Sequence, residues 1–416
     1  MAYPCGGRGP AFESKYMGEG SRAQVPLRLT DEFIAATTYV VGTVDRNLGY
    51  QAEQKFAAGE RWVRAKENGE YVWLSIAGAA TPVGMGGLIA DLIERGLVDA
   101  IVSTGANVYH DLHFACGLPV RHGSAQVDDD DMRADGTTRI YTQLIHNTYT
   151  LKLQDMVNQI IGRRIAGRLP QHFSTAQLIS EFGRELLDDT SGLLVDREGS
   201  MVVRAAEYGV PIFLDSGANH SFGMDLALLA EEGLHVDTSP SEDVVQAAAL
   251  SVFTQPQLNV FLGEGGPRNF TQTTAPTASE IFHIPFDGSA GCIMFTTADP
   301  RTGGLSGSTQ SEAVTWGKYL DANPDREVLV WGEYTLTAPQ VMGYVAGKAG
   351  RAEPRRLMDQ LPRITADFRE QMRARRAELD ADQAELLAIL PRVRAHERRL
   401  REAEGYRFPD SPSTTA

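Results

Sequence analysis

A strand, a turn of small residues and a helix follow one another between residues 71 and 103. Tyr71–Ile76 is a continuous apolar run typical of a buried strand, and it leads into the small-residue turn Ala77–Pro82. A helical pattern from Met85 to about Arg95 comes next, and then the short apolar run Ala100–Ser103. This order predicts a βαβ unit with two parallel strands. Because parallel strands need crossovers that cover the sheet, the pattern restricts the chain to an α/β fold.

The same rhythm returns later in the chain. Four further runs predict strands, and most of the predicted strands lead into Gly, Asp, Ser or Thr: Pro211–Leu214, Leu258–Leu262, Ala290–Phe295 and Glu327–Trp331. The carboxyl ends of parallel strands share one edge, and open α/β sheets bind ligands there. We therefore predict a Rossmann-like α/β domain with a mostly parallel sheet, helices on both faces and a ligand site at the carboxyl edge.

Charge and composition exclude several classes of protein. The 416 residues carry a net charge of −15, whereas a nucleic-acid binder needs clustered Lys and Arg. No run of 18 apolar residues predicts a membrane span, and the N-terminus lacks the apolar segment of a secretory signal. Three distant cysteines predict neither a disulfide framework nor a zinc site. We expect a cytoplasmic protein with small, cationic partners.

Composition also suggests where the domain begins and how it is interrupted. Residues 1–28 are rich in Gly, Ser and charge and predict a flexible tail, with a clasp over a neighbouring subunit as the alternative. Residues 29–345 form the predicted domain. The polar stretch 128–195 predicts an insertion or helical cover with helices at 154–164 and 175–187, and its acidic run Asp128–Asp131 predicts a solvated loop.

The C-terminal part has a different composition. Residues 346–404 are rich in Arg, Glu, Ala and Leu and predict a helical extension of one or two long amphipathic helices. Its apolar positions include Leu379, Leu386, Leu387, Ile389 and Leu390. Pro391 is expected to kink or end the first helix. Packing or oligomerisation is the expected role, and residues 405–416 predict a tail.

A Gly/Ser/Thr-rich loop from Gly303 leads to an acid, a ring and an amine: Glu312, Trp316 and Lys318. A lysine that is partly withdrawn from water has its ammonium form disfavoured, so it can form a Schiff base. A carboxylate and an aromatic face suit a cationic aliphatic substrate. The alternative is an ordinary helix N-terminus with Glu312 in its first turn and a core tryptophan.

A second polar cluster runs from Thr104 to His113. His110 and His113 lie three residues apart, which places them on one face of a helix. They can form a metal pair, although no third ligand is nearby, or they can orient substrate and transfer protons. Asp215, Ser216 and His220 suggest a hydrolase triad, but no Gly-x-Ser-x-Gly accompanies them. No Gly-x-Gly-x-x-Gly follows the first strand, so the residues alone do not predict a dinucleotide.

The chain resembles the deoxyhypusine synthase family over roughly residues 30–345. In that family a Ser-Gly pair, a Glu and a Trp-Gly-Lys run have the order and spacing of Ser306-Gly307, Glu312 and Trp316-Gly317-Lys318. Other segments also fall in family order: 97–107, 209–213, 260–265 and 294–298. The resemblance implies that Lys318 is the nucleophile, that Trp316 packs on a butyl chain and that Glu312 holds an amine.

The resemblance also implies an NAD site at the strand ends and no metal. It assigns the cofactor to Thr104, Gly105, Ala106, Asp111, Gly263, Gly265, Thr297, Ala298, Ser306, Gly307 and Glu333. Glu333 stands where the family has an acid for the adenosine ribose. Tyr109, His110 and Asn269 are expected to contact substrate. The family further implies a homotetramer whose sites are shared between subunits.

The anionic pocket of the family is only partly kept. Arg268-Asn269-Phe270 stands in place of a Lys-His-His run. Acids of the family are matched by Asn219, Met224 and Leu305, with Asp225 one step away as a substitute. Fewer carboxylates hold a substrate with several ammonium groups more weakly, so the substrate or acceptor is expected to have changed.

The predicted function is NAD-dependent transfer of an aminobutyl group from a polyamine such as spermidine, through a lysine Schiff base. A small amine is the favoured acceptor, as in a homospermidine-type reaction. One alternative is a deoxyhypusine synthase that modifies a lysine of a translation factor. The other is a non-catalytic NAD-binding or assembly protein on the same fold.

Overall fold

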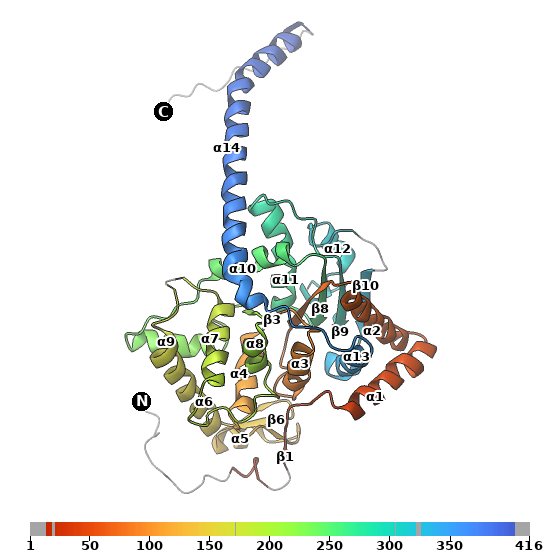
Figure 1. Ribbon diagram of the computed structural model, residues 1–416, viewed down its shortest axis with the longest axis vertical. Helices are drawn as coiled ribbons and strands as arrows, with labels where there is room; N and C mark the ends of the chain where they lie inside the picture. Colours follow the sequence, from red (N-terminus) through yellow and green to blue (C-terminus); the bar gives the residue numbers. More distant parts are fainter. Residues whose placement is uncertain (1–13, 19–20, 171, 304, 322–325, 404–416) are drawn as a thin grey trace.

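The computed structural model describes residues 14–18, 21–170, 172–303, 305–321 and 326–403 (Figure 1). The side chains of Ser306, Leu386 and Leu387 and the predicted tail 405–416 lie outside the described part.

A six-stranded parallel sheet forms the centre of the molecule, with strand order β10-β9-β8-β2-β3-β7. The strands are β2 Tyr71–Ile76, β3 Ala100–Ser103, β7 Ile212–Leu214, β8 Gln257–Leu262, β9 Gly291–Thr296 and β10 Glu327–Trp331. Every predicted strand is confirmed to within one residue at each end. The parallel register puts all six carboxyl ends at one edge, as the sequence predicts.

Helices cover both faces of this sheet. They are α1 Asp31–Tyr39, α2 Gln51–Glu67, α3 Met85–Glu94, α4 Gly105–Ala115, α5 Asp129–Asp135, α6 Asn147–Ile160, α7 Thr175–Leu187, α8 Met201–Tyr208, α9 Ser221–Glu231, α10 Pro240–Phe253, α11 Gly266–Pro276, α12 Gln310–Val314, α13 Tyr334–Lys348 and α14 Leu357–Ala403. The predicted helices from Met85 and over 175–187 are confirmed, and the predicted helix at 154–164 begins earlier, at Asn147.

The alternation of side chains along the strands divides the core into two layers. In β2, Val72, Leu74 and Ile76 belong to the core that packs under α2, α3 and α13. Trp73 points to the opposite face, where it joins Phe213 and the alanines of α10. Because successive side chains of a strand point to opposite faces, a strand that is apolar throughout must be covered on both sides.

Helix α13 packs closely on α1 through two glycines. A Cβ at Gly343 would lie 2.2 Å from Oγ1 of Thr37, and one at Gly347 would lie 2.4 Å from Oγ1 of Thr38. No larger residue fits at these two positions without separating the helices. The predicted domain boundary at residue 345 therefore falls inside a helix that belongs to the core.

The described part of the N-terminal segment is not the free tail that its composition predicts. β1 (Arg22–Ala23) joins an antiparallel sheet of order β1-β4-β6-β5. The other strands of this sheet are β4 Arg121–His122, β5 Thr137–Ile140 and β6 Gln143–His146. The hydroxyl of Ser14, which is 5% exposed, donates to Asp135 at 2.6 Å. Partners more than 90 residues away fix this segment, and composition does not reveal them.

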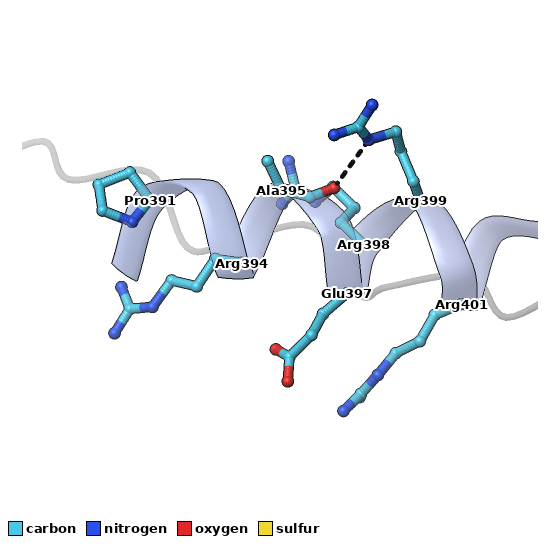
Figure 2. Close-up of a pocket in the computed structure, with 7 residues that line it drawn as sticks. All are labelled: Pro391, Arg394, Ala395, Glu397, Arg398, Arg399 and Arg401. Carbon is cyan, nitrogen blue, oxygen red and sulfur yellow. Dashed lines mark hydrogen bonds between the residues drawn. The ribbon is translucent and has the colours of Figure 1, made fainter. Parts of the chain in front are cut away.

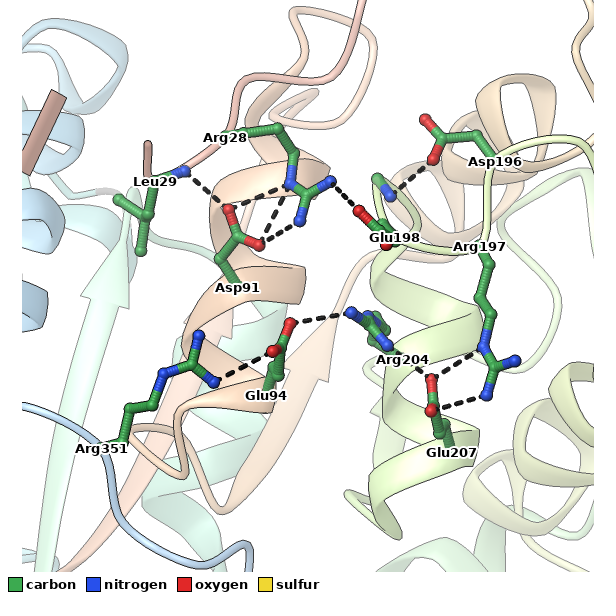
Figure 3. Close-up of polar contacts among 11 residues, drawn as sticks. Arg28, Leu29, Asp91, Glu94, Asp196, Arg197, Glu198, Arg204, Glu207 and Arg351 are labelled. Atoms are coloured by element: carbon green, nitrogen blue, oxygen red, sulfur yellow. Dashed lines mark hydrogen bonds and ion pairs between the residues drawn. The ribbon is translucent and has the colours of Figure 1, made fainter. Parts of the chain in front are cut away.

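The N-terminal segment is also fastened to α3 by an ion pair (Figure 3). Asp91 is 6% exposed and accepts from the guanidinium of Arg28 at 2.6 Å and from the backbone N–H of Leu29 at 2.6 Å. Burial of the carboxylate makes these contacts stronger than a surface ion pair. One helical turn further along α3, Glu94 forms a second group of ion pairs with Arg204 and Arg351.

The acidic run Asp128–Asp131 is not a solvated loop. It forms the start of α5, where the side chain of Asp128 accepts from the backbone N–H of Asp131 at 3.0 Å. Asp129 pairs with Arg139, and Asp131 pairs with Lys15. Carboxylates at a helix N-terminus are favoured by its unpaired N–H groups and dipole, which explains why this charge run is helical.

The C-terminal extension is a single helix, α14, of 47 residues. The backbone remains helical past Pro391, and the helix changes direction near its end in Figure 1. Proline removes one helix hydrogen bond and bends a helix without always ending it. Among the described residues, no helix is long and apolar enough to cross a membrane.

Candidate active site

A cleft opens at the carboxyl edge of β8, β9 and β10. It has a volume of about 240 Å³ and is lined by Gly263, Glu264, Phe295, Thr296, Thr297, Ala298, Gly332, Glu333 and Tyr334. Four residues assigned to the cofactor from the resemblance therefore lie together: Gly263, Thr297, Ala298 and Glu333. Gly265 follows in the same β8–α11 loop, directly before α11.

Tyr334 closes the cleft toward the neighbouring strands. Its hydroxyl donates to the carbonyl of Ala77, after β2, at 3.0 Å. A Cβ at Gly263 would lie 3.3 Å from the Tyr334 ring, so the glycine lets the ring lie against the strand end. Gly263 also has φ of +68°, which favours glycine. Tyr334 is not among the site residues that the sequence predicts. Its position directly after Glu333, at the start of α13, could have indicated that it lines the cleft.

Glu333 has a structural role as well as a place in the cleft. It is the N-cap of α13, and its Oε2 accepts from the backbone N–H of Thr335 at 3.0 Å. The residue is exposed, so a ligand in the cleft can approach the carboxylate. A cap at this point fixes the carboxylate at the mouth of the cleft.

Lys318 follows a turn that ends α12. Gly317 has φ of +65°, and the backbone N–H of Lys318 donates to the carbonyl of Ala313 at 3.2 Å. Tyr319 then forms a parallel bridge with Ser289. A glycine in the left-handed conformation is a common helix ending. The Trp-Gly-Lys run is thus a helix stop that delivers the lysine side chain.

The surroundings of Lys318 disfavour its ammonium form. Partial burial and the charge of Arg268 lower the pKa of the Lys318 amine, and Glu312 acts in the opposite direction. Arg268 is 2% exposed, and its Nη2 donates to the carbonyl of Ser308 at 2.5 Å. A neutral amine held beside a second cation is an activated nucleophile. Arg268 is recognisable in the sequence as a departure from the family, but its effect on the pKa of Lys318 is not.

Lys318 does not line the cleft at the strand ends. Its neighbour Tyr319 bridges to Ser289, which lies shortly before the start of β9 at Gly291, so the lysine lies toward the amino end of that strand. The side-chain amide of Gln272, in α11, donates to the Tyr319 hydroxyl at 2.9 Å. Arg268 connects the cleft with the lysine. It lies in the first turn of α11, directly after the Gly263–Gly265 loop of the cleft, and its charge lowers the pKa of Lys318. Asn269 is half-buried beside it.

Trp316 and Glu312 are exposed in the single chain, Trp316 to 62%. The alternative in which Trp316 is a core residue is therefore wrong. The other part of that alternative, a helix N-terminus with Glu312 in its first turn, is confirmed, since the side chain of Thr309 caps α12. Gly307 lies tightly against the backbone of Asp299, where a Cβ would approach the carbonyl to 2.5 Å, so it shapes the loop that leads to α12.

Thr104, Gly105 and Ala106 lie at the same edge but outside the cleft. They follow β3, which is two strands away from β8. Thr104 caps α4, and its hydroxyl donates to the carbonyl of Gly78 at 3.2 Å. A Cβ at Gly105 would lie 2.1 Å from the His220 ring, so this glycine is explained by packing of the histidine.

Asp111 is a correction to the predicted cofactor set. Its carboxylate is fully buried and accepts from the Ser200 hydroxyl at 2.5 Å and from the N–H groups of Met201 and Val202 at 3.0 Å each. It therefore holds the N-terminus of α8, and no oxygen is directed to a ligand cleft. Its partners are about 90 residues away in the chain, so the sequence does not reveal this role.

The histidines of α4 do not suit proton transfer near neutrality. The rings of His110 and His113 stack at 5.4 Å, which confirms that they share a helix face. Burial lowers the pKa of His110 to about 4 and that of His113 to about 3. No group of three potential metal ligands exists among the described residues. Tyr109, 2% exposed, packs on Phe222 in the core.

Two other sequence interpretations do not survive. Asp225 is 1% exposed, and burial raises its pKa to about 7, so it does not replace a missing acid in an open pocket. The triad of Asp215, Ser216 and His220 does not assemble. Nδ1 of His220 accepts from the N–H of Gly223, and Oγ of Ser216 accepts from the N–H of Asn219. Each of these two side chains accepts a hydrogen bond from a backbone N–H three residues further along the chain.

A parallel sheet with a cleft at its carboxyl edge and a half-buried lysine defines an α/β protein with a ligand-binding edge. The family model of deoxyhypusine synthase matches residues 41–345, and the chain belongs to that family.

Two curated relatives, from Nostoc punctiforme and Methanosarcina acetivorans, are similar to this chain over most of their length. The chain is 34% identical over 300 residues to a "Deoxyhypusine synthase-like protein" of Nostoc punctiforme, covering 70% of this chain and 75% of that protein. It is 30% identical over 294 residues to "Probable deoxyhypusine synthase 2" of Methanosarcina acetivorans, covering 70% and 82%. A solved structure of a candidate deoxyhypusine synthase from Entamoeba histolytica is similar with a TM-score of 0.49 and 15% identity, covering 74% and 92%.

Proposed function

We propose that the protein is an NAD-dependent aminoalkyl transferase that carries an aminobutyl group on Lys318 as an imine and passes it to a small amine. The family supports a transferase, and the finer assignment rests on Lys318. One observation carries the proposal: the lysine is half-buried, and burial together with the charge of Arg268 lowers its pKa.

The residues of the cleft suit one part of an NAD molecule. The cleft of about 240 Å³ is smaller than the roughly 300–1,000 Å³ of a pocket that encloses a whole drug-sized ligand. Gly263, Thr297 and Ala298 allow close approach, and Glu333 presents a carboxylate suited to ribose hydroxyls. Bound NAD would accept a hydride from the carbon beside an amine nitrogen of the donor and later return it.

Lys318 performs the group transfer in this proposal. Its neutral Nζ forms a bond to the oxidised carbon of the donor while the leaving amine departs with a proton. The acceptor amine then attacks the same carbon, the bond to Nζ breaks, and Lys318 recovers its proton. In this proposal Glu312 holds an ammonium group near the transferred aminobutyl group, and the ring of Trp316 packs on its alkyl chain.

A small acceptor is favoured over a protein lysine because this chain keeps few acids. Asn219, Met224 and Leu305 stand where acids are expected, and Asp225 is buried. We further propose a cytoplasmic homotetramer, in which a neighbouring subunit covers the exposed Trp316.

Reductive trapping tests the central step. The protein is incubated with NAD and one amine at a time, then treated with borohydride and analysed by peptide mass spectrometry. We expect an alkylamine adduct on Lys318 and none on the Lys318→Arg variant, whose side chain is long and basic but stays protonated and forms no imine. Absence of an adduct and of transient NADH absorbance across a broad amine panel would favour a non-catalytic NAD-binding protein.

A competition experiment tests the acceptor. Putrescine and an initiation-factor protein are offered together with labelled spermidine. Label in a small-molecule product supports the proposal, whereas label on the protein makes the chain a true deoxyhypusine synthase.

A further inference from the structure

Helix α14 is attached to the body only through its first turns. Leu361, Ile364 and Phe368 are buried in the core layer that includes α10. Beyond Met372, the described side chains are exposed, apart from the half-buried Leu379. Figure 1 shows the rest of the helix projecting away from the body. Residues 373–403 extend about 46 Å at 1.5 Å per residue.

The projecting part carries apolar side chains that no described part of the chain covers. Ile389, Leu390, Val393 and Leu400 are 43%, 36%, 45% and 52% exposed. Leu379, Val393 and Leu400 are separated by multiples of seven residues. A seven-residue spacing is the pattern by which one helix packs along another in a coiled coil. An apolar line on an isolated helix indicates a partner helix.

The charges of this segment are divided into two blocks. Residues 377–390 contain four acids, Glu378, Asp380, Asp382 and Glu385, and no Lys or Arg. Residues 391–401 contain five arginines and a single acid, Glu397. Figure 2 shows Arg394, Arg398, Arg399 and Arg401 of the second block. They line a hollow of about 650 Å³ whose described lining residues all come from α14. The acidic block of one helix is therefore complementary in charge to the basic block of a second copy that runs in the opposite direction.

We propose that the α14 helices of two copies of this chain pair antiparallel about a two-fold axis between residues 389 and 390. In this register Leu379 lies opposite Leu400 of the partner subunit, and Ile389 lies opposite Leu390 of the partner subunit. A two-fold axis repeats each contact, so the apolar line is covered over its whole length on both copies. Pro391 lies next to the axis, so both helices bend at the same place.

The same register pairs the two charge blocks. Glu378 lies beside Arg399 of the partner subunit, Asp380 beside Arg401 of the partner subunit, and Glu385 beside Arg392 of the partner subunit, because flanking side chains meet on the same side of the apolar line. Asp382 faces Glu397 of the partner subunit, which is a like-charge contact. A parallel pairing in register would instead place every acid beside its own copy. Because flanking charges set the orientation of helix pairs, the antiparallel arrangement is favoured.

Contacts within the helix do not oppose this pairing strongly. Glu378 pairs with Arg375 at 2.8 Å, and Asp380 pairs with Arg376 at 3.3 Å. Exposed pairs of this kind within one helix stabilise it only weakly, so the acids can exchange partners readily.

The apolar contact is tested by oxidative cross-linking of chains that carry Leu379→Cys/Leu400→Cys, because a body that is itself a homotetramer would keep its mass when the helices separate. Adding Ile389→Glu/Val393→Glu is expected to abolish the covalent dimer. The control, Ala384→Glu/Ala395→Glu, adds the same charge away from the apolar line and is expected to keep the covalent dimer. Thermal unfolding checks that the body is folded in both. An unchanged yield of covalent dimer with Ile389→Glu/Val393→Glu overturns the proposal.

Charge exchange tests self-recognition in chains that also carry Leu379→Cys/Leu400→Cys. One variant carries Glu378→Arg, Asp380→Arg and Glu385→Arg, and the other carries Arg392→Glu, Arg399→Glu and Arg401→Glu. Each alone is expected to give no covalent dimer, because like charges then meet, and an equal mixture is expected to regain it. If the mixture gives no covalent dimer, the helices do not pair through these charges.

Oxidative cross-linking tests the orientation. Leu379→Cys/Leu400→Cys is expected to give a covalent dimer, while Leu379→Cys alone is expected to give none. Cross-linking of Leu379→Cys alone would mean a parallel pair. The readout is cross-linking of α14, so it does not depend on the proposed chemistry of Lys318.

Discussion

At the scale of single residues, the charge balance around Lys318 is the feature most open to experiment. Arg268 lowers the pKa of the lysine and Glu312 raises it. The amine must be neutral to attack, so the acid limb of the rate of imine formation follows the Lys318 pKa. Arg268→Gln should raise that pKa and move the acid limb to higher pH, because the charge of Arg268 disfavours the ammonium form. The measurement is the pH profile of adduct formation by stopped-flow trapping.

Two related variants control this prediction. Arg268→Lys keeps the positive charge and should leave the limb nearly in place. Glu312→Gln removes the charge that favours the ammonium form, so its limb should move to lower pH. Shifts of the same sign for Arg268→Gln and Glu312→Gln would contradict the electrostatic explanation.

At the scale of elements, the turn after α12 determines where Lys318 lies. Gly317 has φ of +65°, which costs any other residue about 1–2 kcal/mol. Gly317→Ala should lower the free energy of unfolding by about that amount and should reduce trapping at Lys318 far more than it reduces stability. Urea unfolding and borohydride trapping measure the two effects. Gly303→Ala, in the loop that precedes α12 and with no atom within 4 Å of the added Cβ, should change neither.

The strands and the carboxyl edge could be predicted from the sequence because their signals are local. A run such as Tyr71–Ile76, apolar on both faces, has few structural alternatives in a soluble chain. The acidic run at Asp128–Asp131 was misjudged because a charge run and a helix N-terminus have the same composition. The N-terminal segment was misjudged because its hydrogen bonds reach Asp135 and Asp91, far along the chain.

The candidate site was predictable in part, for the same reason. Gly263, Thr297, Ala298 and Glu333 end neighbouring strands, so strand order brings them together. Asp111 is held by Ser200 and two N–H groups of α8, and the packing of distant helices decides that. The low pKa of His113 likewise reflects burial that its own sequence does not reveal.

At the scale of the whole molecule, the contact between the N-terminal segment and α3 should contribute to global stability. Asp91→Asn removes a buried charge that accepts from Arg28 and Leu29. We expect the free energy of unfolding to fall by about 2–3 kcal/mol, measured by urea denaturation. Glu198 also pairs with Arg28, but its side chain is 66% exposed, so Glu198→Gln should cost less than about 1 kcal/mol. Equal losses would mean that burial of the carboxylate is not what matters.

The close packing of α13 on α1 has a consequence for the order of events during synthesis. Gly343 and Gly347 lie against Thr37 and Thr38, so the first helix of the domain is completed by one made some 300 residues later. Until the ribosome has released α13, the apolar side of α1 has no cover and is open to chaperones. Nascent chains arrested before residue 334 should therefore remain chaperone-bound, whereas chains long enough to expose residue 348 should be released.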